Sequence, residues 1–450
     1  MLNQQSRVRS FHVRRLKQMD LTSRQKAAVR RHLWKRKRGT DGKMHWVRID
    51  AQHTDTRGAS DDDQQPVPEP VQSDWTPAGT IRVSDSTRQI QCDDDLEEIA
   101  ALTFHEKNKW FLAEVQKRWR NYDEGHIQFV VRREHLVSDS MEQMLKCPPS
   151  RFWERLRIYF ENEPGLDAGG LIREWYEKLS ESLFNDDFGL FISTKGENLG
   201  YWINPASASK VKDHLHYYEF VGRLLAKALI EGYNMKMSLA LPLIKHILSV
   251  PISFSDLEFL DEDLYKNAMW MKKNDHAELL NIDFTVQVIT SEGKSTTEEL
   301  KPGGSNIDVT DANKKEYLEL LLKHYMFRSI SDQLGALLKG FYDVMPAFLL
   351  SVFDYQEFDL LLSGIPDIDV SDWHAHSEIL AAFTAEERAR LLQFATGTSR
   401  VPRGPPPTGL MPKGHTCFNR IDLPLYHTME ELMNYLTLVI NMEISGFWME

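Results

Sequence analysis

The sequence predicts an α+β protein in which helices predominate and the strands are short. Apolar residues recur at helical spacing over much of the chain, and beyond residue 150 helices dominate the prediction. Residues 127–131 and 286–290 are short runs rich in β-branched residues, which is typical of strands. With 450 residues, the chain is long enough for two or three domains, each with its own core.

Charge is distributed unevenly along the chain. The net charge is −12, yet residues 1–40 hold thirteen Lys and Arg against one acid, Asp20, and so carry +12. The remainder therefore carries −24. We interpret residues 1–51 as a basic N-terminal extension and predict a basic helix over residues 22–38. This extension is either a solvated charged helix, a nuclear-import signal, or a binding element for an acidic partner such as nucleic acid or an acidic lipid surface.

Residues 52–95 are predicted to be a disordered, acidic and proline-rich linker. Their Asp, Gln, Pro and Ser content leaves too little apolar surface to offset the entropy of ordering. Regular structure is expected to resume near Leu96.

Helices are predicted at four further places. Residues 104–119 form an amphipathic pattern with Trp110, Phe111 and Val115 at helical spacing. A second helix is expected to open at Thr310 as its cap, and residues 333–353 hold one or two helices interrupted at Pro346. A capping-box pattern at Thr428 starts the last helix. The predicted buried positions of the second and last helices are Tyr317, Leu318, Leu321, Leu322, Tyr325, Leu432, Tyr435, Leu436 and Val439.

Several classes of protein are excluded by composition. No apolar stretch is long enough to span a membrane, and the first residues do not resemble a secretory signal. The three cysteines, Cys92, Cys147 and Cys417, are isolated and odd in number, which argues against a disulfide framework and for a reducing compartment, the cytosol or nucleus. No Cys-x-x-Cys pair or phosphate-loop motif occurs, so we expect no metal and no organic cofactor.

The segment around Cys417 is typical of a thiol nucleophile. If residues 415–417 are extended, His415 and Cys417 point to the same side, and the imidazole can assist proton transfer or favour the thiolate. The alternative is a buried structural cysteine beside an incidental histidine.

Residues 413–424, Lys-Gly-His-Thr-Cys-Phe-Asn-Arg-Ile-Asp-Leu-Pro, resemble the active-site signature of HECT-type ubiquitin ligases. Further blocks resemble the same family in the same order, over about residues 103–450. These blocks lie at residues 131–133, 139–140, 166–175, 188–191, 203–205, 220–228, 309–315, 364–373 and 392–400.

The resemblance implies a bilobed HECT-like fold. It has a large, mostly helical N-lobe, here residues 96–375, and a small α/β C-lobe, residues 376–450, that carries the catalytic cysteine. It further implies that Cys417 accepts ubiquitin from a ubiquitin-conjugating enzyme as a thioester and passes it to a lysine of an unknown protein substrate. This mechanism divides one difficult transfer into two easier ones.

The resemblance also implies roles for other residues. His415 and Thr416 match positions that flank the nucleophile, Asp167 matches an acidic residue that orients the attacking lysine, and Phe447 matches a terminal aromatic needed for transfer. Phe188 matches an aromatic of a non-covalent ubiquitin site. The alternatives are a turn residue for Asp167, a disordered tail position for Phe447, and a core aromatic for Phe188.

The conjugating enzyme is expected to dock on residues 239–288. Most apolar residues there are expected to be core, and the exposed ones to form an apolar groove for a partner loop. The residues concerned are Leu243, Ile247, Leu248, Leu257, Leu260, Tyr265, Met269, Trp270 and Met271.

Two segments are shorter than in the family, near Glu378 and near Arg403. The first removes residues of the inter-lobe hinge, and the second removes part of the sheet that supports Cys417. A shortened gene model, a splice form or a degenerate enzyme would each produce this. The alternative function is therefore a catalytically impaired scaffold that binds a conjugating enzyme or ubiquitin without transfer.

Overall fold

The structure of the chain is a computed structural model. It describes residues 34–38, 44–48, 96–120, 125–163, 170–196, 199–289, 295–364, 383–384, 386–388, 390–391, 413–415, 420–422 and 428–441. The chain divides into two compact units. Unit 1 comprises Met1–Lys117, Phe184–Ala226 and Met237–Leu361, and unit 2 comprises Arg118–Leu183, Lys227–Lys236 and Leu362–Glu450. Among the described helices, none combines the length and apolar character needed to span a membrane.

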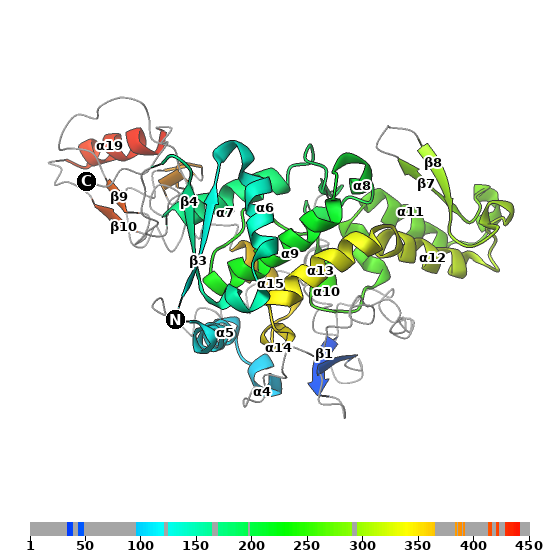
Figure 1. The fold of residues 1–450 in the computed structure, drawn as a ribbon. Helices are drawn as coiled ribbons and strands as arrows, with labels where there is room; N and C mark the ends of the chain where they lie inside the picture. Colours follow the sequence, from blue (N-terminus) through cyan, green and yellow to red (C-terminus); the bar gives the residue numbers. More distant parts are fainter. Residues whose placement is uncertain are drawn as a thin grey trace. The chain divides into compact units, whose positions relative to one another are not determined.

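Unit 1 is predominantly helical, with three antiparallel strand pairs (Figure 1). The pairs are β1 (Trp34–Arg38) with β2 (Met44–Arg48), β5 (Phe191–Ser193) with β6 (Tyr201–Ile203), and β7 (Thr285–Ile289) with β8 (Ser295–Glu299). The helices, a few of which extend slightly beyond the unit, are α4 (Leu96–Ala100), α5 (Phe104–Arg118), α8 (Ser207–Lys210), α9 (His214–Glu231), α10 (Leu241–Ile247), α11 (Glu262–Lys273), α12 (Lys314–Met326), α13 (Ser331–Val344), α14 (Ala347–Leu350) and α15 (Tyr355–Ser363).

Two glycines allow α9 and α13 to touch at their backbones. A Cβ atom on Gly222 would lie 2.0 Å from the carbonyl oxygen of Leu337, and one on Gly340 would lie 2.0 Å from that of Glu219. No side chain fits at such a separation. This close approach of the two backbones explains why glycine occupies both positions inside helices.

His246 of α10 is a buried neutral histidine. Its Nε2 lies 2.8 Å from the carbonyl oxygen of Met326, which requires the Nε2–H tautomer. Burial lowers the pKa of His246 from 6.5 to about 4.

The shifted pKa of His246 predicts a loss of stability in mild acid. The unfolded chain takes up a proton as the pH falls through 6.5, whereas the folded chain resists until about pH 4. Stability therefore decreases over that window, by about 2 kcal/mol between pH 7 and pH 5. Urea unfolding at pH 7 and at pH 5 measures the change. Between these two pH values, the free energy of unfolding should decrease less for His246→Gln than for the parent. Equal decreases would contradict the prediction, and exposed His105→Gln serves as the control.

The prediction of a helix over residues 22–38 is wrong for residues 34–38, the part of that range that the structure describes. Residues 34–38 form strand β1, paired with β2 in the register Trp34↔Arg48 to Arg38↔Met44. The Trp46 indole Nε1 donates to the carbonyl oxygen of Leu248, 3.5 Å away. Pairing with the neighbouring strand β2 outweighs the helical propensity of this short cationic segment. Residues 22–33 and the linker predicted at 52–95 lie outside the described residues. The acidic partner of the basic N-terminal extension and the cellular location of the chain stay predictions.

Unit 2 is built on a parallel strand pair. Strands β3 (His126–Val131) and β4 (Arg155–Phe160) pair from His126↔Arg155 to Val131↔Phe160. Helices α6 (Leu136–Lys146) and α7 (Gly170–Leu183) contact these strands, and the Trp175 indole donates to the Ser140 hydroxyl at 2.8 Å. The unit also contains the end of α9, the strands β9 (Lys413–His415) and β10 (Arg420–Asp422), and the helix α19 (Met429–Asn441).

The fully buried Lys227 of α9 connects the elements of unit 2. Its Nζ donates to the carbonyl oxygens of Phe152 at 2.9 Å and Glu154 at 2.7 Å, and lies 2.8 Å from Glu231 Oε1. The same Glu231 oxygen accepts from the Leu156 N–H at 2.9 Å. The ammonium group therefore neutralises a buried carboxylate and satisfies two carbonyls beside β4.

Most of the predicted elements are confirmed. Helix α5, strands β3 and β7, the break between α13 and α14 at Pro346, and the start of α19 lie where the sequence placed them.

Thr310 is not a helix cap. Its N–H donates to the Asn313 side chain at 2.7 Å, and this turn delays α12 until Lys314. Strands β4, β5 and β6 were not predicted, and the lobe boundary at residue 375 lies outside the described residues.

Candidate functional site

The predicted nucleophile lies in the segment that joins two paired strands. Strands β9 and β10 are antiparallel, with His415 paired to Arg420 and Lys413 to Asp422. Residues 416–419, including Thr416 and Cys417, connect them and lie outside the described residues. The strand ends at His415, so extended geometry through Cys417 stays a prediction.

Helix α19 follows this hairpin in the sequence and carries part of a small apolar cluster. Phe383, Leu391 and Leu436 are its buried members, and Leu432 and Met433 pack against them. Leu432 and Leu436 were predicted to face a core, and this is confirmed. The cluster therefore joins α19 to residues 383–391 of the same C-terminal segment.

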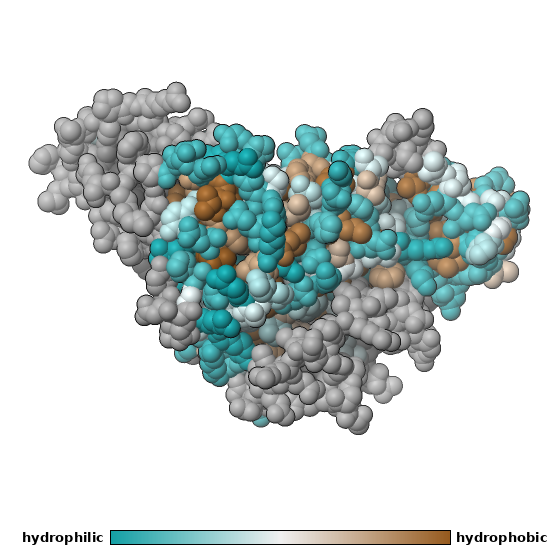
Figure 2. All heavy atoms as spheres, viewed as in Figure 1, coloured by the Kyte–Doolittle hydropathy of each residue, from teal (hydrophilic) through white to brown (hydrophobic). Residues whose placement is uncertain are grey.

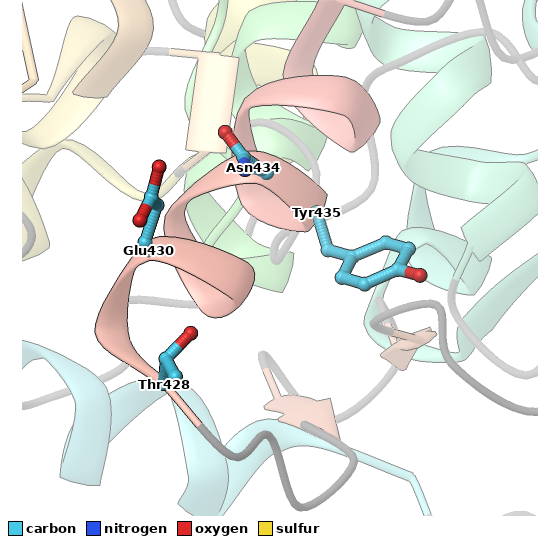
Figure 3. A pocket seen from close by; sticks show the side chains of 4 residues that line it. All are labelled: Thr428, Glu430, Asn434 and Tyr435. Carbon is cyan, nitrogen blue, oxygen red and sulfur yellow. The ribbon is translucent and has the colours of Figure 1, made fainter.

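A shallow hollow lies along α19 (Figure 3). It is lined by Thr428, Glu430, Asn434 and Tyr435, with Glu430 and Asn434 on the same side of the helix. The lining contains no nucleophile beside a base, so the hollow suggests no chemistry of its own.

Asp167 and Phe447 lie outside the described residues, but the frame around Asp167 is described. Glu163 precedes the segment 164–169 and Gly170 opens α7 after it. Two arginines follow β3, and each pairs with a carboxylate. Arg132 forms a bidentate pair with Asp139 at 2.9 and 2.7 Å, and Arg133 pairs with both Glu163 and Glu174. Hydrogen bonds from Arg132 lower the pKa of Asp139 to about 2.

Sequence reasoning did not assign a role to Arg133. The residue belongs to one of the family-like blocks, Val131-Arg132-Arg133, and that block was the available signal. Its partners are 30 and 41 residues away, so no local pattern reveals the contacts.

The region predicted to bind a conjugating enzyme contains three exposed apolar residues. Trp270 of α11 is 51% exposed, and Leu279 and Leu280 of the 3-10 helix η9 (Ala277–Leu280) are 76% and 39% exposed. We call these three residues the α11–η9 surface. Over this end of unit 1, hydrophobic residues appear between hydrophilic ones (Figure 2). Of the other predicted residues, six are buried as expected and two, Tyr265 and Met269, are half-buried. The six are Leu243, Ile247, Leu248, Leu257, Leu260 and Met271.

Phe188 is half-buried and contacts another aromatic residue. Its ring centroid lies 5.7 Å from that of Tyr217, at 76° between the ring planes. The ring is therefore neither a core aromatic nor fully exposed, and its role in ubiquitin binding stays a prediction.

One group of potential metal ligands occurs among the described residues, formed by His276, Glu278 and Asp311. The Asp311 carboxylate already accepts hydrogen bonds from the N–H groups of His276 and Ala277 and from Lys314 at 2.7, 3.1 and 2.9 Å. Hydrogen bonds lower the pKa of Asp311 to about 2, the His276 N–H contributing most. These contacts explain the grouping without a metal ion, and the Lys314 ammonium would repel a cation.

Comparison with known protein families shows which family the chain belongs to. The model of the HECT-domain (ubiquitin-transferase) family matches residues 177–450, which include Cys417 and its flanking strands. The chain belongs to the HECT-domain family. The α+β character expected for such a protein is confirmed by the mixture of helices and small sheets.

Other HECT proteins are similar over most of this chain. The E3 ubiquitin-protein ligase UPL1 of Arabidopsis thaliana is 35% identical over 387 residues, and HUWE1 of Mus musculus is 35% identical over 385 residues. These alignments cover 77% and 78% of the chain but 10% and 9% of the relatives. Smurf1 of Drosophila melanogaster is 36% identical over 72% of the chain and 34% of its own length. This HECT chain thus spans about a tenth of the first two relatives.

Proposed function

We propose that this HECT chain transfers ubiquitin from a ubiquitin-conjugating enzyme to a protein substrate through a thioester on Cys417. The observation that carries the proposal is the family match over residues 177–450. Relatives named as E3 ubiquitin-protein ligases align over three quarters of the chain and support it. A bilobed arrangement, with residues 96–375 as N-lobe and 376–450 as C-lobe, belongs to the same proposal.

The chemistry proceeds in two balanced steps. The Cys417 thiolate attacks the thioester carbonyl carbon of the charged conjugating enzyme, and the enzyme's sulfur leaves with its electron pair as a thiolate. A substrate lysine amine then attacks the new thioester, forms the isopeptide bond and releases the Cys417 thiolate. The proton lost by the amine passes to water, and Asp167 orients the attacking lysine. His415 and Thr416 flank the nucleophile, and Phe447 assists transfer.

The test is a single-turnover assay with ubiquitin-charged conjugating enzymes and the full chain. A ubiquitin adduct that thiols cleave should form and then decay as lysine is added. Binding of the charged enzyme with no adduct would instead favour the scaffold alternative, in which the shortened segments near Glu378 and Arg403 prevent transfer.

Docking of the conjugating enzyme is proposed at the α11–η9 surface. Trp270 belongs to a residue type that is enriched in binding hot spots, and Leu279 and Leu280 add exposed apolar area within the same predicted region. Because these side chains are exposed, their loss should weaken association while leaving the core of unit 1 intact.

We expect Trp270→Ala to raise the concentration of charged conjugating enzyme needed for half-maximal transfer by roughly 30-fold, equivalent to about 2 kcal/mol. The matched control is Leu112→Ala on α5, which removes a side chain of similar exposure, 47%. The measurement is adduct formation against enzyme concentration, with thermal unfolding of each variant. An unchanged half-maximal concentration for Trp270→Ala would place the docking site elsewhere.

A further inference from the structure

Strand β3 of unit 2 has one edge that no other strand covers. Among the residues that the structure describes, β3 pairs with β4 alone. The Glu161 N–H donates to the Val131 carbonyl at 2.9 Å, so the peptide groups of Val131 face β4. Because peptide groups alternate in direction along a strand, those of Val130 face the outer edge. An uncovered edge of this kind is a template on which another strand can add.

The sequence of β3 favours such addition. Residues 126–131, His-Ile-Gln-Phe-Val-Val, include no Lys, Arg, Asp, Glu, Pro or Gly. Ile127, Phe129 and Val131 are buried on one face of the strand, whereas Val130 on the other face is 47% exposed. Short segments with high β propensity, little charge and no proline readily pair with copies of themselves. The outer edge of β3 is therefore liable to pair with the same strand of a second copy of the chain.

The side-chain amide of Gln143 takes the place of a neighbouring strand at this edge. Helix α6, which carries Gln143, lies beside β3 (Figure 1). The Gln143 Nε2 donates to the Val130 carbonyl at 2.7 Å, and its Oε1 accepts from the Val130 N–H at 3.0 Å. The Nε2 also donates to the Asp139 carbonyl at 3.1 Å, which fixes the orientation of the amide. A side-chain amide offers the same donor and acceptor as a peptide group, so Gln143 makes both bonds that an added strand would make to Val130.

Two charged side chains bond to the same strand on either side of Val130. The Asp139 Oδ2 accepts from the Arg132 N–H at 3.0 Å, and the Arg151 Nη2 donates to the His126 carbonyl at 2.9 Å. We call Gln143, Asp139 and Arg151 the edge-blocking residues. An added strand would have to displace all three before it could pair along the whole edge.

The backbone of β3 does not need these side chains to satisfy its hydrogen bonds. Val130 is about half exposed, so water could bond to its peptide groups in the absence of Gln143 at small net cost. Water, however, is readily displaced by an approaching strand. Gln143 is not, because α6 is anchored by its fully buried residues Ser140 and Met144 and by the Trp175–Ser140 hydrogen bond.

We propose that the edge-blocking residues prevent β3 from pairing with β3 of a second copy of this chain. The occupant that they exclude is a second copy because an exposed strand edge is self-complementary when two strands meet in antiparallel orientation. This role is independent of ubiquitin transfer.

The test is the self-association of Gln143→Ala in the full chain, measured by sedimentation velocity over a series of concentrations. We expect this variant to associate at a concentration at least about tenfold below that of the parent, since both bonds to the Val130 peptide groups become available to another strand. The matched control is Glu142→Ala on the same helix, whose side chain is 63% exposed and pairs with Lys146. It should associate no more than the parent does.

Hydrogen exchange locates the contact. Peptides spanning residues 126–132 should exchange faster in Gln143→Ala than in the parent at low concentration, and more slowly at high concentration, where the strands pair. Association without that protection would overturn the proposal, as would a Gln143→Ala variant that associates no more readily than the parent.

A second substitution separates strand pairing from association of a misfolded chain. In the Gln143→Ala background, Val130→Lys places a charge at an exposed position of the edge strand, which opposes the addition of another strand. The double variant should return to the behaviour of the parent. Association that persists in the double variant would show that Gln143→Ala acts through misfolding and would refute the edge-blocking role.

Discussion

Replacing Cys417 with alanine is expected to abolish the ubiquitin adduct, and replacing it with serine is expected to give an adduct that thiols no longer cleave. A thioester forms only on sulfur, so its loss in the alanine variant identifies the acceptor atom. A serine hydroxyl at the same place can form an oxyester, which is more stable and reacts more slowly with amines. The serine adduct should therefore accumulate and resist added lysine, and gel analysis with and without a reducing agent measures both outcomes.

The matched control for Cys417 is Cys147. Cys147 is buried at the end of α6, so Cys147→Ala should retain the thiol-sensitive adduct. An adduct that persists in Cys417→Ala and disappears in Cys147→Ala would contradict the assignment. Absence of an adduct on the parent with every charged conjugating enzyme would leave the scaffold function as the better account.

The sequence predicted the secondary structure best where a pattern is local. Apolar spacing placed α5, and Pro346 placed the break between α13 and α14, because helical periodicity and proline geometry act within a few residues. Strand β1 was taken for a helix, since its pairing with β2 is the feature that decides its structure. Gly39 and Gly42, which stand between the two strands in the sequence, were the signal that could have indicated a hairpin.

In the candidate site, too, the sequence predicted what depends on local residues and missed what depends on distant contacts. Cys417 could be predicted because a rare residue in a family-like block is recognisable from the sequence alone, and the family match includes it. The contacts of Arg133 could not, because its partners Glu163 and Glu174 become neighbours only when β3 and β4 pair in parallel. A contact that depends on a crossover between strands has no spacing rule to reveal it. The exposure of Leu279 and Leu280 likewise depends on packing that the sequence does not display.

Replacing Lys227 with methionine should destabilise the folded chain by about 3–5 kcal/mol, since it removes one partner of a buried ion pair. Methionine has a similar length, so the loss is electrostatic and leaves no large cavity. The Glu231 carboxylate, 6% exposed, would lose its cation, and the carbonyl oxygens of Phe152 and Glu154 would each lose a donor. Urea unfolding at neutral pH measures the change.

A second substitution tests whether the uncompensated charge is the cause. In the Lys227→Met background, Glu231→Gln removes the buried charge and keeps an oxygen that can accept from the Leu156 N–H. The double variant should therefore recover part of the lost stability, although Glu231→Gln alone is destabilising because it leaves Lys227 buried without its partner. Lys236→Gln, whose side chain is 58% exposed, should cost less than about 1 kcal/mol. Two results would contradict the role of the ammonium group in holding α9 to the chain around β4. One is a loss of less than about 1 kcal/mol for Lys227→Met, and the other is no recovery of stability in the double variant.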